Sequence, residues 1–153
     1  MTPLERGQLW VMRIHGAIAS AVLLAAGTVG GLVLQEQELF PLAGALAPLV
    51  AVAIYLVFIS PGRRYAAWSY ALDQDDLRIG RGVWTQVSTM VPLDRVQHLD
   101  IAQGPIERAF SVCRLVLHTA GTLHSQVTLP GLTRETAERM RDEIRARVQP
   151  EPQ

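Results

Sequence analysis

Two uncharged apolar stretches decide the architecture: Ile14–Leu34, IHGAIASAVLLAAGTVGGLVL, and Leu39–Ile59, LFPLAGALAPLVAVAIYLVFI. Only the polar residues 35–38 separate them. Each stretch has 21 residues and would form an α-helix about 31 Å long, which matches the hydrocarbon core of a bilayer. The sequence therefore predicts an integral membrane protein that begins with a two-helix transmembrane hairpin over 14–59, with spans 14–34 and 39–59.

A cleaved signal peptide is the alternative interpretation of the first stretch. The apolar region of a signal peptide usually has about 7–15 residues. Here the first stretch is longer, and a second stretch of equal length follows after four residues. This pattern favours the transmembrane hairpin.

The arginines around the two stretches predict the orientation of the hairpin. Arg6 and Arg13 precede the first stretch, Arg63 and Arg64 follow the second, and the loop between them carries only glutamates as charged residues. Basic residues are retained on the cytoplasmic side of a membrane. We therefore expect a multi-pass protein of the cytoplasmic membrane with both termini in the cytoplasm.

Small residues recur at four-residue spacing in both stretches and form a candidate helix–helix seam. They are Gly27 and Gly31 in the first stretch and Ala43, Ala47 and Ala51 in the second. Small side chains allow helix backbones to approach closely in lipid. Two interpretations remain open: packing within the hairpin, or a dimer seam at Gly27 and Gly31.

Composition limits the remaining possibilities. The chain has 153 residues, with 14 basic and 14 acidic residues and a formal net charge of zero. This leaves room for the hairpin and one small globular domain. A neutral chain without a concentrated basic face does not favour nucleic-acid binding. The single cysteine, Cys113, excludes an internal disulfide.

After the second stretch the pattern changes to short alternating segments. A leader covers 1–13, a basic juxtamembrane linker 60–64, a cytoplasmic domain 65–148 and a tail 149–153. Period-2 alternation predicts six or seven antiparallel strands in the domain. Thr133 is expected to cap a C-terminal amphipathic helix. Closure into a partly open β-barrel, with this helix covering one end, would protect the sheet edges.

The same alternation gives three more specific expectations. Trp68, Trp84 and Cys113 should face the core. A hairpin turn about residues 120–122 should bring His118 opposite His124 on the outer face, where the two could share a metal ion or a proton. The alternative for this pair is two ordinary surface residues.

The order of these segments resembles the bacterial pleckstrin-homology-like domain of the YdbS-like membrane proteins. The resemblance rests on Trp68–Leu72, Asp76–Ile79 with Gly82, Val91–Gln97, Gln103–Arg108 and Leu129–Leu132. It implies a PH-like fold on a two-helix anchor in the bacterial inner membrane. It also implies a role in binding or assembly, and it supplies no catalytic residues.

The leading hypothesis is a membrane-anchored interaction module that binds a protein partner or assembles with itself. The alternative is a domain that senses anionic lipids through Arg63, Arg64, Arg78 and Arg81. Phosphoinositide recognition is not expected, because the loop 73–76 carries three acids and no base. The sequence has no metal-ligand spacing, nucleophile elbow or phosphate-binding loop. We therefore expect no enzyme activity, no cofactor and no small-molecule substrate.

Overall fold

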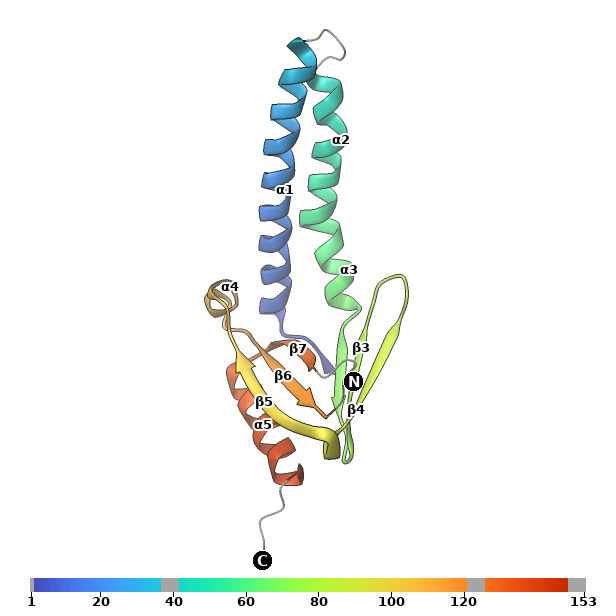
Figure 1. Ribbon diagram of the computed structural model, residues 1–153, viewed down its shortest axis with the longest axis vertical. Coiled ribbons are helices and arrows are strands. Elements are labelled where there is room, and N and C mark those ends of the chain that lie inside the picture. Colours follow the sequence, from blue (N-terminus) through green and yellow to red (C-terminus); the bar gives the residue numbers. More distant parts are fainter. Residues whose placement is uncertain (1, 37–41, 121–125, 149–153) are drawn as a thin grey trace, which may run out of the picture. The chain divides into compact units, whose positions relative to one another are not determined.

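The computed structural model describes residues 2–36, 42–120 and 126–148 (Figure 1). The chain divides into two compact units, of which one is Leu9–Arg63 and the other combines Met1–Gln8 with Arg64–Gln153. Several sequence expectations fall on residues 37–38, 121–124 and 149–153, which lie outside the described residues. His124 is among them.

The first unit is an antiparallel pair of long helices (Figure 1). Helix α1 covers Arg6–Glu36, and the second helix consists of α2 (Leu42–Ile54), the π-helical η1 (Tyr55–Ile59) and α3 (Ser60–Ala66). Two segments, Arg6–Val33 and Leu46–Ala66, are long and apolar enough to cross a membrane. The structure extends both predicted spans, because α1 begins before residue 14 and the expected linker 60–64 is helical.

The π-helical turn lies directly before Pro61. The Ser60 N–H donates to the Tyr55 carbonyl five residues earlier. In a regular α-helix, the ring of Pro61 would collide with the carbonyl of Val57. A wider turn relieves this collision, and insertions of this kind are a known cause of local helix irregularity.

The two helices pack through small residues of α1. A Cβ on Gly16 would collide with the backbone carbonyl of Leu56, and a Cβ on Gly27 would collide with the Leu49 side chain. Between these positions, the Ser20 hydroxyl lies 2.7 Å from the Gly16 carbonyl and 3.4 Å from the Ala53 carbonyl. Close backbone approach and a hydroxyl contact therefore define the seam within the hairpin.

The seam follows only part of the predicted spacing. Gly27 lies in it and Gly31 is buried, but Ala47 and Ala51 are exposed. The side chain of Ala43 lies outside the described part of the structure. The contact line of α2 passes through Leu49 instead, and a residue two positions earlier points about 200° away around a helix.

The second unit contains two antiparallel sheets. The first sheet has the order β1 (Thr2–Pro3), β2 (Ser69–Leu72), β3 (Asp76–Arg81) and β4 (Val87–Pro92). The second has the order β5 (Val96–Ala102), β6 (Cys113–Thr119) and β7 (Gln126–Leu132). The short helices η2 (Leu93–Arg95) and α4 (Pro105–Ala109) connect strands, and α5 (Arg134–Val148) follows the last strand.

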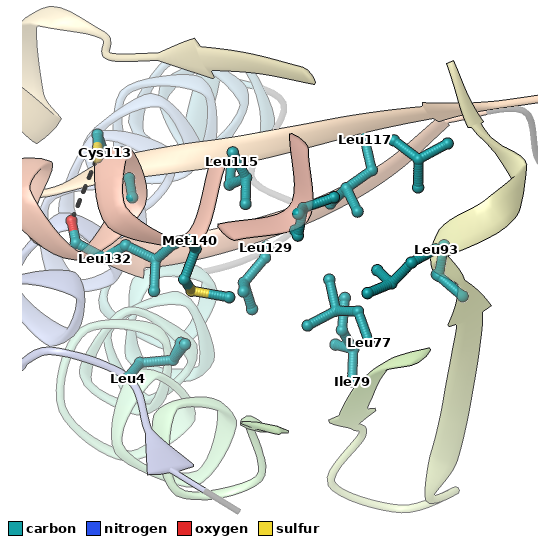
Figure 2. Close-up of a cluster of buried hydrophobic side chains, with 14 residues drawn as sticks. Leu4, Leu77, Ile79, Leu93, Cys113, Leu115, Leu117, Leu129, Leu132 and Met140 are labelled. Carbon is teal, nitrogen blue, oxygen red and sulfur yellow. Dashed lines mark hydrogen bonds between the residues drawn. The ribbon is translucent and has the colours of Figure 1, made fainter. Parts of the chain in front are cut away.

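Both sheets and α5 bury side chains in one core, part of which Figure 2 shows. Leu77 and Ile79 come from β3, and Leu115 and Leu117 come from β6. In each pair the residues are two positions apart, which places both on the same face of a strand. Helix α5 contributes the stripe Ala137, Met140 and Ile144. Its start is capped as predicted, because the Thr136 N–H donates to the Thr133 hydroxyl at 3.1 Å.

The N-terminal segment belongs to this unit, although the sequence suggested a separate leader. Thr2 lies opposite Tyr70 in the first sheet. The Glu5 N–H donates to the Gly131 carbonyl at 2.9 Å. Leu4 is buried in the core. The domain is therefore assembled from both sides of the hairpin sequence.

Candidate functional site

A groove of about 590 Å³ lies between the two sheets of the domain. One wall comes from Val87, Ser88 and Thr89 of β4, and the other comes from Gln126, Val127 and Thr128 of β7. Trp68 and Ile79 also line it. We call this the β4–β7 groove.

The two strands that line the β4–β7 groove each lie at the edge of a sheet. Among the described strands, β4 pairs only with β3 and β7 pairs only with β6. An outer strand presents backbone N–H and C=O groups that an added strand can use. The β4–β7 groove is thus suited to an extended polypeptide segment, with Val87 and Val127 supplying apolar contact.

A second concavity of about 360 Å³ adjoins this groove and shares Trp68, Arg81 and Val87 with it. Its remaining lining residues are Arg64, Gly82, Val83 and Trp84. We call it the Arg64–Arg81 pocket. Two guanidinium groups beside apolar side chains favour an anionic, partly apolar ligand.

The four arginines proposed as headgroup contacts do not all line one pocket. Arg64 and Arg81 line one pocket. Arg78 is instead held by Asp76 at 2.9 Å and Asp73 at 3.6 Å. The hydrogen bond that Arg78 donates to the Asp76 carboxylate raises the pKa of Arg78 above its usual value. Arg63 is exposed in α3 and belongs to the helical unit.

The acidic β2–β3 turn is tied to the end of α5. The Asp73 N–H donates to the Asp76 carbonyl at 2.8 Å, and the Arg147 guanidinium donates to the carbonyls of Asp73 and Gln74. The turn therefore uses an arginine to satisfy its own backbone, and its carboxylates still oppose a polyanionic ligand.

The histidines are arranged differently from the sequence expectation. His118 lies opposite Gln126 of β7, so the predicted pairing of His118 with His124 is wrong in register. His118 instead lies opposite His98 of β5, and both approach Asp100, at 3.2 Å and 3.1 Å respectively. In the described part of the chain, no group of three or more His, Cys, Asp or Glu residues is arranged to hold a metal ion.

Cys113 is buried, as the alternation predicts. Its thiol donates to the Leu132 carbonyl at 3.4 Å (Figure 2). Burial raises the pKa of the Cys113 thiol, and the negative charge of Glu107 adds to the effect. A protonated, buried thiol is a poor nucleophile.

Of the two tryptophans expected in the core, only Trp68 packs against it. Trp84 is 84% exposed. The alternation had suggested a strand from residue 83, but β4 begins at Val87 and residues 82–86 form the connection from β3. The signal for this connection was Gly82, which adopts a φ of 111° that favours glycine.

Residues 17–148 match the Bacterial PH domain family. The chain belongs to this family. It is 33% identical over 139 residues to the UPF0699 transmembrane protein YdbS of Bacillus subtilis (strain 168), an alignment that covers 89% of this chain and 85% of YdbS. The UPF0699 transmembrane protein YdbT of the same organism is 26% identical over 102 residues, which cover 66% of this chain and 20% of YdbT. No solved structure matches the chain.

Membership of this family confirms the resemblance to YdbS-like proteins and the PH-like interpretation of the two sheets and the C-terminal helix. The chain is accordingly a membrane-associated PH-like module. The β4–β7 groove and the Arg64–Arg81 pocket are its candidate binding surfaces.

Proposed function

We propose that this bacterial PH domain protein is an interaction module that holds an extended segment of a protein partner, or of a second copy, beside the cytoplasmic membrane. The β4–β7 groove carries the proposal, because two outer strands, each paired with a neighbour on one side only, line one concavity. Strand addition supplies backbone hydrogen bonds, and pockets for alternate side chains supply specificity. The proposed role is binding, without catalysis and without a cofactor.

The proposal includes an inner-membrane location with both termini in the cytoplasm. One folded unit contains both residues 1–8 and residues from 64 onward, so it holds both ends of the hairpin. This supports placing the two ends on the same face of the membrane. The arginines near both ends, Arg6, Arg13, Arg63 and Arg64, support the cytoplasmic face. The Arg13 guanidinium also lies 5.0 Å from the centre of the Trp10 ring, a combination suited to the membrane interface.

Anchoring would strengthen binding without any new contact. A domain confined to the membrane surface meets neighbouring membrane proteins at a raised effective concentration. A shallow groove with few apolar contacts can therefore hold a partner in the membrane that it would release in dilute solution.

Site-specific photocrosslinking in intact membranes tests this function. A photoreactive amino acid at Ser88 or Gln126, both exposed residues of the β4–β7 groove, should form covalent adducts that mass spectrometry identifies as one partner or as the chain itself. The matched control is position Glu135 on α5, which is also exposed. Ser88→Trp, which fills the groove, should remove the adduct formed from position 126, whereas Glu135→Trp should not. Equal adducts from all positions would contradict the proposal.

A second candidate is recognition of anionic phospholipid, which the Arg64–Arg81 pocket favours. Both guanidinium groups line that pocket, and neither has an ion pair with another described residue. In native mass spectrometry of the detergent-solubilised full chain, phosphatidylglycerol should be retained more than phosphatidylcholine. Arg64→Gln and Arg81→Gln should each reduce this preference, and Arg139→Gln on α5 should leave it unchanged. Equal retention of both lipids by the unaltered chain would remove this candidate.

A further inference from the structure

The connection between β3 and β4 presents the most exposed large apolar side chain in the described residues, Trp84. Val83 precedes it, and both lie in the Arg64–Arg81 pocket lining. At this exposure the indole ring keeps a large apolar area in contact with water. Val87, which is also exposed, lines the same pocket and extends this apolar surface. An apolar cluster of this kind on a domain surface marks a contact with another phase or molecule.

The backbone at the start of this connection is tightly constrained. Gly82 has a φ of 111°, and a Cβ at this position would collide with the Thr85 carbonyl. Only glycine fits this turn without strain. The turn therefore sets the direction in which Val83 and Trp84 leave the sheet.

One residue of the Arg64–Arg81 pocket belongs to the helix that forms the second candidate span. The Arg64–Arg81 pocket contains Arg64, which is in the last turns of α3, and α3 ends the candidate span Leu46–Ala66. The β3–β4 connection therefore shares a pocket with a residue from the last turn of that span. Tryptophan and arginine are the residues that favour the headgroup region, where the indole ring and the charge are both accommodated.

We propose that Val83 and Trp84 insert into the headgroup layer of the membrane that carries the hairpin, with Arg64 and Arg81 beside lipid phosphates. The occupant of the Arg64–Arg81 pocket is an anionic phospholipid of that same bilayer. The inference rests on the proposed membrane anchoring and deepens the lipid candidate, because it names the inserting residues. It also gives the domain a second attachment, which restricts its rotation about the anchor.

Depth-dependent fluorescence quenching tests the insertion. The full chain is reconstituted in nanodiscs of phosphatidylglycerol and phosphatidylcholine, with or without bromine on the acyl chains near the headgroups. The emission of the unaltered chain minus that of Trp84→Phe isolates Trp84. We expect brominated lipid to reduce this difference at least twofold and aqueous acrylamide to have little effect. Strong quenching by acrylamide with none by brominated lipid would overturn the insertion and would assign the loop to water or a protein contact.

The contribution of charge is tested with matched variants. Arg81→Gln should reduce the bromine quenching of Trp84, whereas Arg139→Gln, an equal change of charge at an exposed position of α5, should not. If Trp84→Phe alters the fold, a bimane label at Val83→Cys in a Cys113→Ser chain reports the same environment, and a water-exposed label overturns the insertion. Extraction with alkaline carbonate distinguishes failure of the membrane anchoring from failure of the insertion. A chain that is released from membranes refutes the anchoring. A chain that is retained, but whose Trp84 is quenched by acrylamide, refutes only the insertion.

Discussion

The hydroxyl of Tyr65 donates a hydrogen bond of 2.6 Å to the carbonyl of Leu4. These residues are 61 positions apart, one before the first candidate span and one in the last turn of the second. The bond joins the two chain segments at which the hairpin leaves and re-enters the domain. It explains why the first eight residues belong to the same unit as the PH-like sheets.

Tyr65→Phe should loosen this junction. It leaves the Leu4 carbonyl without its donor, and loss of such a bond costs about 1–3 kcal/mol. Chemical unfolding of the full chain in detergent should show this decrease in the free energy of unfolding of the domain, and trypsin should cleave after Arg6 faster. Tyr55→Phe in the second span is the matched control. Equal stability of the two variants would show that the bond contributes nothing.

Gly131→Ala should destabilise the same junction from the other side. Gly131 has a φ of 71°, and an added Cβ would lie 2.8 Å from the Cβ of Gln8 and 3.1 Å from that of Leu4. The strained backbone and the overpacking together should cost about 2–4 kcal/mol. Gly62→Ala, where a Cβ meets no atom within 4 Å, should have little effect in the same unfolding experiment. A neutral Gly131→Ala would indicate that residues 4–8 do not pack here.

Gly16→Ala should separate the two helices of the hairpin. The added Cβ would collide with the Leu56 carbonyl, and a backbone atom cannot move aside as a side chain can. We expect a loss of about 1–3 kcal/mol, measured by titration of the bicelle-reconstituted chain with sodium dodecyl sulfate. Gly30→Ala adds the same methyl group where a Cβ meets no atom within 4 Å. If Gly16→Ala and Gly30→Ala unfold at the same fraction of sodium dodecyl sulfate, the seam does not run through Gly16.

Cys113 should make the domain less stable at alkaline pH. Burial raises the pKa of its thiol in the folded state, so the folded chain holds this proton more tightly than the unfolded chain does. The resulting stability is fully present below the unfolded thiol pKa of about 8.5 and is lost as the pH rises through the folded value. Cys113→Ala should therefore lose less stability than the unaltered chain between pH 8 and pH 11.

Tyr70 also titrates with a raised pKa, but it does not affect the comparison of the Cys113→Ala variant with the unaltered chain. Burial, followed by the charge of Glu5, raises the pKa of Tyr70, but this tyrosine is present in both chains and its contribution cancels in the difference. A thiol reagent should also label native Cys113 at least tenfold more slowly than the unfolded chain. Parallel pH profiles for the two chains would contradict the buried-thiol explanation.

Several features could be read from local patterns. An uninterrupted apolar stretch predicts a span because each residue must be compatible with lipid. The stripe Ala137, Met140 and Ile144 predicts the buried face of α5 because helical spacing places these residues together. Alternation similarly identified Trp68 and Cys113 as residues that face the core.

The amino-acid sequence by itself thus determined the two apolar helices, the alternating strands and the C-terminal helix, since these depend on the environment that each short segment requires. Tertiary structure alone decided which segments meet. A shift of two residues leaves every side chain on its own face of a strand, so alternation could not distinguish Gln126 from His124 as the neighbour of His118. Likewise, the hydrogen bond between Tyr65 and Leu4 depends on a contact between distant segments, and the exposure of Trp84 depends on the turn between two strands. A local pattern of residues contains neither.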